Sequence, residues 1–292
     1  MPTLSVVVPC YNGGKFLDQL TASLARQTFR DFETIVVNDG STDPLTLKKL
    51  AALAPGIRVL NQENRGLSAA RNAGIAAASA DIVLVLDCDD QLEPAYLAKT
   101  LAALQANPAA GFAYTHIRLV GGASGIQERY ANAFDILFKN CLGYTVLMHK
   151  AAWLKAGKYD ESMRDGYEDW EFNLRLIHAG FAGVAVPQAL FLYTASTQGM
   201  LLGHSSNRHA AVWRRIRAKH RALYRAGSLV RLYRAHREGS RLSPVRLIAQ
   251  LALASLVSDA LHNRIMSFVR RWRMARSKAD AAGAVRPRAG VT

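Results

Sequence analysis

The sequence has few cysteines, few aromatic residues and no long apolar run. Its three cysteines, Cys10, Cys88 and Cys141, include no Cys-x-x-Cys pair, which excludes a disulfide framework and favours a reducing compartment. The longest apolar run near the C-terminus, 247–257, contains two polar residues and is shorter than the roughly 20 residues that span a bilayer. We therefore expect a cytoplasmic protein without a signal peptide or a membrane span.

Negative charge is also scarce, and its distribution is uneven. The 292 residues carry 37 Lys and Arg against 22 Asp and Glu, a net charge of +15, while half of the residues are hydrophobic. Residues 205–292 hold 20 basic and three acidic side chains, whereas residues 1–204 hold 17 basic and 19 acidic ones. The chain can bury a substantial core, and its C-terminal part is suited to meeting polyanions such as phospholipid headgroups or nucleic acid.

Apolar runs rich in β-branched residues alternate with segments of helical spacing along the chain. This alternation predicts parallel βαβ units, and therefore an α/β fold with a mostly parallel open sheet flanked by helices. The expected strands are 4–8, 32–37, 57–60, 82–86, 112–116, 146–149, 184–186 and 190–193. The expected helices are 15–27, 45–53, 69–78, 94–104, 151–156 and 168–180, with a flexible loop at 121–126.

Polar motifs follow the first four predicted strands. They are Asn12, Asp39, the segment 64–72 and the acidic cluster 87–90. Because the carboxyl ends of parallel strands meet at one edge of a sheet, we expect these groups to line one ligand site. The carboxylates of the cluster can converge on a hard divalent cation, which would neutralise a diphosphate. The alternative is that the cluster only caps the next helix.

Five motifs occur in the order and spacing of the family 2 inverting glycosyltransferases, which the chain resembles over about residues 3–200. They are Val-Pro-Cys-Tyr-Asn at 8–12, Val-Asn-Asp-Gly-Ser-Thr-Asp at 37–43, the segment 64–74, Leu-Asp-Cys-Asp-Asp at 86–90 and Tyr-Glu-Asp-Trp at 167–170. The resemblance implies a GT-A fold, a nucleotide-diphosphate sugar donor, a Mn²⁺ or Mg²⁺ ion and an acceptor hydroxyl. We expect a GT-A domain at 1–204 and a basic helical C-terminal extension at 205–292.

The resemblance also implies residues that bind the donor. Asp39 would accept a hydrogen bond from the nucleotide base, and Tyr11 would pack its ring on the base. Arg71 carries a fixed charge suited to the diphosphate, and Arg65 is the exposed alternative. The full donor-binding set is Pro9, Tyr11, Asn12, Asp39, Arg65, Arg71, Asp87 and Asp90. The alternatives are an Asx-turn role for Asp39, a packing role at the sheet edge for Tyr11 and an ordinary solvent-exposed position for Arg71.

The acidic residues have two expected roles, metal binding and proton transfer. Asp89 is the leading metal ligand by resemblance, Asp87 and Asp90 share the ribose and metal contacts, and His204 is a further candidate ligand. Glu168 and Asp169 match the segment that supplies the general base, which takes the proton of the acceptor hydroxyl. Asp169 is our choice for that base. The alternatives are a helix cap for Asp169 and a solvated loop position for His204.

The expected activity is the transfer of one sugar, with a UDP-sugar as the favoured donor. Residues 171–176 do not match the Gln-x-x-Arg-Trp signature of the processive synthases of the family, and no membrane span is expected. The acceptor would be a hydroxyl of a saccharide or lipid-linked molecule in envelope polysaccharide or glycoconjugate synthesis. The alternatives are a nucleotidyltransferase and an inactive protein that binds anionic surfaces or nucleic acid.

The C-terminal extension predicts arginine-rich helices from 210 onward, broken at Gly227, Gly239 and Pro244, with disorder at 281–292. Basic and apolar stretches together favour peripheral attachment to the inner face of the cell membrane. Nucleic acid is disfavoured because aromatic residues are few and no nucleic-acid motif is present. The alternative is that four apolar residues pack on the first domain or on a second copy of the chain, namely Leu247, Leu251, Val257 and Leu261.

Overall fold

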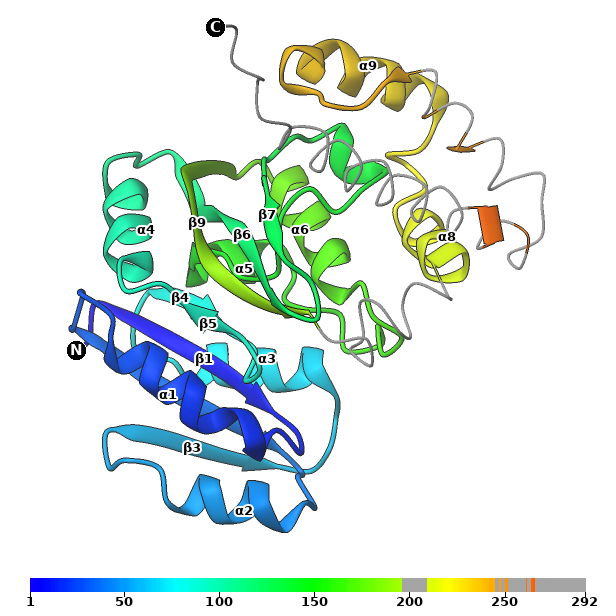
Figure 1. Cartoon of the computed structure of the whole chain (residues 1–292). Helices are drawn as coiled ribbons and strands as arrows, with labels where there is room; N and C mark the ends of the chain where they lie inside the picture. The colour runs from blue at the N-terminus through cyan, green and yellow to red at the C-terminus, as the bar shows by residue number, and fades with distance from the viewer. Residues whose placement is uncertain (196–208, 245–246, 248–249, 252–260, 262–263, 266–292) are drawn as a thin grey trace, which may run out of the picture.

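The computed structural model describes residues 1–195, 209–244, 247, 250–251, 261 and 264–265. Within this part of the chain, a curled, mixed and mostly parallel sheet is flanked by helices (Figure 1). The strands are β1 Leu4–Cys10, β2 Phe32–Asp39, β3 Ile57–Gln62, β4 Ile82–Val85, β5 Gln91–Leu92, β6 Ala110–Gly121, β7 Gly125–Gln127, β8 Leu147–His149 and β9 Ala182–Ala195. Their order is β3-β2-β1-β4-β8-β6-β9-β5, with β7 paired to β6. The α/β prediction is confirmed.

Helices connect and cover these strands. The longer ones are α1 Leu17–Ala25, α2 Pro44–Ala51, α3 Leu67–Ala77, α4 Tyr96–Gln105, α5 Lys150–Lys155, α6 Glu168–His178, α8 His209–Lys219 and α9 Ala226–His236. Single 3₁₀ turns lie at η1 Gly14–Phe16, η2 Asp135–Leu137 and η3 Arg237–Gly239. No helix of the described residues is long and apolar enough to cross a membrane.

The first four strands form the predicted parallel unit. β1 pairs in parallel with both β2 and β4, and β2 pairs in parallel with β3. All seven residues of β1 are buried, as expected of a central strand covered on both faces. Helix α3 approaches the sheet closely at Gly74, where an added Cβ would lie 2.3 Å from Cγ1 of Val7. A side chain at this position would therefore force the helix away from the sheet.

The second half of the sheet differs from the expectation in two places. One strand, β9, replaces the two strands expected at 184–186 and 190–193, because its parallel pairing with β6 shifts register near Pro187 and then continues. The loop expected at 121–126 instead turns into β7, which pairs antiparallel with β6. Gly121 and Gly125, both with positive φ, allow this tight return.

The described residues after 208 pack on the part of the chain that precedes residue 196. Val212, Trp213, Ile216 and Leu247 share a buried cluster with residues that include Phe134, Ile136, Leu137, Trp170 and Leu174. Leu251 packs against the edge of this cluster, Leu261 is 47% exposed, and Val257 lies outside the described residues. Two of the four apolar residues, Leu247 and Leu251, therefore pack on the rest of the chain, as the alternative to membrane attachment expects.

The helix break expected at Gly227 is wrong. Helix α9 begins at Ala226 and runs through Gly227, and the preceding break lies at 220–225. Glycine is tolerated there because it lies in the first turn, two residues after the extended N-cap residue Arg225. The break expected at Gly239 coincides with the end of η3. The disorder expected at 281–292 and the metal ligand expected at His204 lie outside the described residues.

Candidate active site

Asn12 connects the turn after β1 to the loop after β2 through hydrogen bonds. This residue has a left-handed φ of 49°, and its Oδ1 accepts the backbone N–H groups of Thr42 at 2.8 Å and Asp43 at 3.0 Å. Its own N–H donates to Oγ of Ser41 at 3.0 Å. The neighbouring Tyr11 is 53% exposed at the end of β1. Asn12 thus holds the site in shape, while the ring of Tyr11 is accessible to a ligand.

Asp39, at the end of β2, accepts hydrogen bonds from the loop between β3 and α3. It is only 3% exposed. Its Oδ1 accepts the backbone N–H of Arg65 at 2.9 Å and the amide of Gln62 at 2.6 Å, and its Oδ2 accepts the N–H of Gly66 at 2.9 Å. A carboxylate offers about four acceptor directions, so one remains for a donor such as a base N–H. The structure therefore adds a loop-holding role to the predicted base contact.

Arg71 lies deeper than expected. Its side chain is 1% exposed, Nη2 donates to both oxygens of Asp87 at 3.0 Å, and Nη1 donates to Oε1 of Glu168 at 2.8 Å. The rings of Tyr144 and Tyr159 lie 5.0 and 5.4 Å from the guanidinium. Burial alone would lower the pKa of Arg71, but the two carboxylates raise it well above its ordinary value.

The side chain of Arg71 is enclosed by protein, and its expected contact with a diphosphate stays a prediction. The guanidinium is surrounded by protein, because α3 packs against the sheet. This packing directs the side chain of Arg71 toward the C-terminal end of β4 and the N-terminal end of α6. Arg65, the alternative, has a side chain that is 61% exposed and pairs with Glu161 at 2.8 Å. Of the two arginines, Arg65 is the one that a ligand could reach.

The acidic cluster splits into exposed and buried members. Asp87 and Asp89 are partly exposed, while Asp90 is 1% exposed. Oδ1 of Asp90 accepts the backbone N–H of Thr194 at 2.6 Å, and Oδ2 accepts the hydroxyl of Tyr144. Burial and the charge of Asp89 raise the pKa of Asp90 well above its usual range. Asp90 thus joins the acidic turn to β9, and the donor contact expected of it stays a prediction.

Asp87 and Asp89 fit a divalent cation. Burial and the charge of Asp87 raise the pKa of Asp89 to about 6, so two neighbouring carboxylates repel each other in the absence of a cation. Mg²⁺ and Mn²⁺ prefer such oxygen ligands. No cluster of three or more His, Cys, Asp or Glu side chains suited to a metal ion occurs among the described residues. Substrate oxygens, water and the candidate His204 would supply the remaining ligands. The helix-cap alternative is wrong, since no side chain caps α4.

Glu168 and Asp169 open helix α6, directly after Tyr167 in a left-handed conformation with φ 62°. Glu168 is 6% exposed, and burial raises its pKa to about 7 although Arg71 opposes the shift. Asp169 is partly exposed, and its Oδ2 accepts the amide of Asn140 at 2.7 Å while its Oδ1 accepts the N–H of Trp170 at 2.8 Å. Burial also raises the pKa of Asp169. A raised pKa and a fixed orientation suit a general base.

Several site residues were missed by the sequence reasoning. Tyr144 accepts the N–H of Asp87 at 3.1 Å, donates to Asp90 and faces Arg71. Asn140 orients Asp169. His209 stacks between Trp170 and Trp213, at ring separations of 6.2 and 6.1 Å. No local sequence signal marks these residues, because each is an isolated polar or aromatic position brought to the site by the fold.

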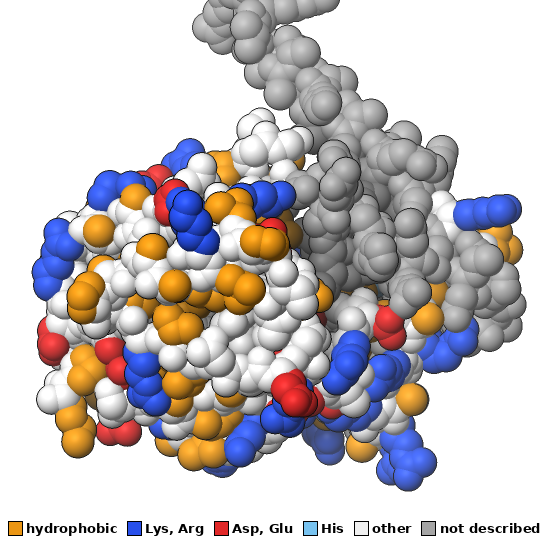
Figure 2. All heavy atoms as spheres, turned by 90° about the horizontal axis from the view of Figure 1, so that it is seen from below, with side chains coloured by type: hydrophobic (Ala, Val, Ile, Leu, Met, Phe, Trp, Pro, Cys, Tyr) orange, Lys and Arg blue, Asp and Glu red, His pale blue; other side chains and the backbone are white. Residues whose placement is uncertain are grey.

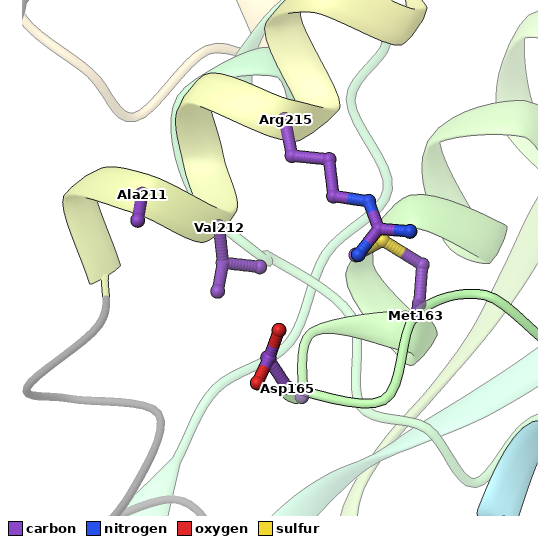
Figure 3. A pocket seen from close by; sticks show the side chains of 6 residues that line it. Met163, Asp165, Ala211, Val212 and Arg215 are labelled. Carbon is purple, nitrogen blue, oxygen red and sulfur yellow. The ribbon is translucent and has the colours of Figure 1, made fainter.

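A cavity of about 320 Å³ lies between the loop before α6 and helix α8 (Figure 3). Its lining residues are Met163, Asp165, Gly166, Ala211, Val212 and Arg215. Met163 and Val212 are buried, whereas Asp165 and Arg215 are exposed. Arg215 is held to the loop through Ser162, whose carbonyl and hydroxyl oxygens accept from Nη2 at 2.8 and 2.9 Å. The cavity thus combines an apolar floor with one acidic and one basic group.

Comparison with known proteins gives consistent results. The model of the family described as "Glycosyl transferase family 2" matches residues 5–155. The putative glycosyltransferase EpsH of Bacillus subtilis is 38% identical over 102 residues, which cover 34% of this chain and 30% of EpsH. An uncharacterized glycosyltransferase of Haemophilus influenzae is 29% identical over 183 residues, covering 60% of this chain and 62% of the relative. The chain thus spans less than two thirds of either relative.

The fold also matches a solved structure. The S. aureus TarS 1-349 structure in complex with UDP-GlcNAc superposes with a TM-score of 0.62 at 22% identity. The match covers 73% of this chain and 65% of the TarS chain. At this identity the similarity shows a shared fold, that of the GT-A structures.

Proposed function

The chain belongs to glycosyl transferase family 2, and from this premise we propose that it moves one sugar from a nucleotide-diphosphate sugar to an acceptor hydroxyl with inversion. One observation carries the proposal: Arg71 binds Asp87 on one side and Glu168 on the other. This double contact brings the proposed metal-binding end of β4 next to the turn that holds Asp169. A leaving diphosphate and an attacking hydroxyl would meet at this junction.

The donor is a UDP-sugar in this proposal. Tyr11 offers an exposed ring for the uracil, and Asp39 retains an acceptor direction for its N–H. The TarS structure with UDP-GlcNAc supports a donor of this class. Asp87 and Asp89 would hold Mn²⁺ or Mg²⁺, which when bound would neutralise the diphosphate as it leaves. His204 remains a further candidate ligand.

Asp169 is the proposed general base. Asn140 and the N–H of Trp170 each occupy one of its carboxylate oxygens, which fixes the carboxylate plane and leaves lone pairs for the acceptor proton. The acceptor hydroxyl would lose this proton to Asp169 as its oxygen attacks the anomeric carbon from the side opposite the diphosphate. Glu168 is held by Arg71 and supports the turn without taking the proton.

The acceptor is a saccharide or lipid-linked hydroxyl in polysaccharide or glycoconjugate synthesis. Chondroitin synthase of Pasteurella multocida, 34% identical over 96 residues that cover 32% of this chain and 10% of the synthase, supports polysaccharide chemistry. The cavity beside Asp165 and Arg215 is also lined by Gly166, three residues before Asp169, so it is a candidate site for part of the acceptor. Its apolar floor and charged rim suit a sugar ring and its hydroxyls.

Peripheral attachment to an anionic membrane is part of the proposal. Figure 2 shows Lys and Arg side chains on both the left and the right of that view, interspersed with acidic and hydrophobic ones. The exposed arginines of the described extension are Arg214, Arg215, Arg221, Arg225, Arg231, Arg234, Arg237, Arg241 and Arg264. Each contributes about 1 kcal/mol near an anionic surface. Co-sedimentation with anionic liposomes at low and high salt tests this, and binding that ignores salt and lipid charge would contradict it.

Nucleoside diphosphate release tests the central claim. The purified chain would be incubated with a panel of nucleotide sugars and acceptors, with Mn²⁺, with Mg²⁺ and with a chelator. We expect metal-dependent UDP release and glycosylated acceptor from wild type, and donor binding without transfer from Asp169→Asn. Asp81→Asn is the matched control, since Asp81 is exposed and lies outside the site. Pyrophosphate release would instead indicate a nucleotidyltransferase, and full transfer by Asp169→Asn would refute the assigned base.

A further inference from the structure

Two of the three cysteines meet at the ends of neighbouring strands. In the parallel pair β1 and β4, Val7 lies opposite Val85, and the N–H of Leu86 donates to the carbonyl of Val7 at 2.9 Å. Cys10 is the last residue of β1, and Cys88 lies in the turn three residues after the end of β4.

The sulfur atoms also face each other. Both approach Gly13, where an added Cβ would lie 2.4 Å from Sγ of Cys88 and 3.4 Å from Sγ of Cys10. The two thiols are hydrogen-bonding neighbours. Cys10 is 1% exposed, whereas Cys88 is partly exposed and can be reached by a small reagent. Cys141, 1% exposed, lies in the separate cluster with Trp170 and Trp213. The pair therefore has a built geometry that the third cysteine does not share.

We propose that Cys10 and Cys88 are a reversible thiol–disulfide site that is oxidised by a peroxide and that switches off nucleotide binding. The loss of nucleotide binding rests on the proposed function, whereas the disulfide itself does not. The motif position gives the reason for the coupling, since Cys88 is the residue between Asp87 and Asp89. Any displacement of Cys88 moves the backbone that carries both carboxylates.

The chemistry balances with a peroxide as the oxidant. One sulfur of the pair, as its thiolate, attacks one peroxide oxygen, so that an S–O bond forms, the O–O bond breaks and water leaves with the thiol proton. The other sulfur then attacks the oxidised one, which forms the S–S bond, breaks the S–O bond and releases a second water. The two thiols lose two electrons in total and hydrogen peroxide gains them. A dithiol reductant restores both thiols by exchange.

The disulfide has a structural consequence at the site. A bonded pair of sulfurs lies only about 2 Å apart, so the acidic turn and the turn after β1 must draw together at Gly13. Asp87 is held on its other side by Arg71 and Tyr144. Since Asp87 is restrained and Cys88 is pulled, the separation and orientation of Asp87 and Asp89 must change. A cation and diphosphate that need both carboxylates would then bind less well.

The test uses the full chain with hydrogen peroxide as the oxidant and UDP with Mn²⁺ as the binding probe. After peroxide treatment, peptide mapping without reductant should find Cys10 linked to Cys88 and Cys141 still reduced. The stabilisation by UDP with Mn²⁺ in thermal unfolding should weaken, corresponding to a loss of affinity of about tenfold or more, and a dithiol should restore it. After peroxide treatment, Cys88→Ala and Cys10→Ala should each be stabilised by UDP with Mn²⁺ as much as before treatment. Cys141→Ala should lose this stabilisation as wild type does.

Each contrary result has a clear meaning. A sulfinic acid on Cys88 without the linked peptide, or a linkage between two chains, would overturn the proposed site. A linked protein that binds UDP as well as the reduced protein would overturn the switch. If reduced protein shows no response to any nucleotide, the proposed function fails, and the disulfide is then judged from the linked peptide alone.

Discussion

The hydroxyl of Tyr167 lies 3.1 Å from Nδ1 of His209, and this contact joins the turn before Asp169 to the first residue of α8. Tyr167 has a left-handed backbone, which is uncommon for a bulky residue and needs support from its surroundings. The ring of His209 lies nearly parallel to those of Trp170 and Trp213, at 13° and 17°. Helix α8 of the basic extension thus supports the turn that carries the proposed base.

Removing the hydroxyl of Tyr167 tests this support. We expect Tyr167→Phe to cost about 1 kcal/mol of unfolding free energy, because one partly buried hydrogen bond is lost. We also expect kcat to fall more than the KM for the donor changes, since the turn positions the base and not the nucleotide. Urea unfolding and steady-state kinetics measure both effects. Tyr233→Phe, in the same buried cluster, is the matched control, and an unchanged kcat in Tyr167→Phe would remove the positioning role.

Arg71 is expected to be a large stabilising contact because it neutralises one buried carboxylate, Glu168, and one partly exposed carboxylate, Asp87. Arg71→Met should destabilise the fold by about 3–5 kcal/mol, since Asp87 and Glu168 would lose their common counter-charge. Adding Glu168→Gln should recover part of this loss, because it removes one of the uncompensated charges. Denaturant unfolding of the single and double variants checks the coupling. Arg65→Met should cost no more than about 1 kcal/mol, as expected of an exposed pair, and additive losses in the double variant would contradict the prediction.

Asp89 and Asp90 should give opposite phenotypes although they are adjacent. Asp89→Ala should lose metal-dependent turnover on the order of a hundredfold or more with little change in stability, because its carboxylate faces the proposed cation. Asp90→Ala should lower the unfolding free energy by about 1–3 kcal/mol, because Tyr144 and the N–H of Thr194 lose their acceptor. Turnover and thermal unfolding would be measured for both variants. Near-normal metal-dependent activity in Asp89→Ala would exclude its role at the metal.

Glu171 should make the junction between α6 and α8 sensitive to acid. It is fully buried, and burial would raise its pKa, but His220, Arg175 and Lys219 lower the pKa to about 2. A depressed folded-state pKa gives stability that is present above the unfolded value near 4.5 and is lost as the pH falls toward 2. The full effect would be about 3 kcal/mol.

The unfolding free energy measured between pH 5 and about 2 checks this prediction. Glu171→Gln should flatten the dependence in that window relative to wild type. Glu128→Gln is the control, because Glu128 forms an exposed pair with Arg241 and should leave the pH profile nearly unchanged. Parallel profiles for wild type and Glu171→Gln would show that Glu171 does not contribute.

Sequence reasoning located the elements whose signals are local. The buried strands before Asn12, Asp39 and Asp87, and the start of α6 at Glu168, follow from apolar runs and motif order. The depth of a side chain does not follow from such signals. An arginine on an alanine-rich helix looks solvated in sequence, yet Arg71 is buried because α3 packs closely on the sheet at Gly74.

The same limit applies to contacts between distant segments. Asp90 looks like a third ligand in a run of carboxylates, but the return of β9 places the N–H of Thr194 against it. Asn140 and His209 have no sequence pattern that marks them, since their partners Asp169 and Tyr167 are 29 and 42 residues away. Such roles depend on long-range packing, which periodicity and motif spacing do not encode.

The long pairing of β6 with β9 decides where the chain can be shortened for expression. A fragment cut after α5 would keep every strand of the first parallel unit but would leave β6 without its partner along eleven paired positions. Its unpaired backbone groups would form an exposed, apolar sheet edge of the kind that recruits other chains into aggregates. The same cut would remove α6 with the proposed base. Any soluble fragment must therefore extend at least through Ala195, and insolubility of a shorter one would reflect an open edge and not a failure of the first parallel unit to fold.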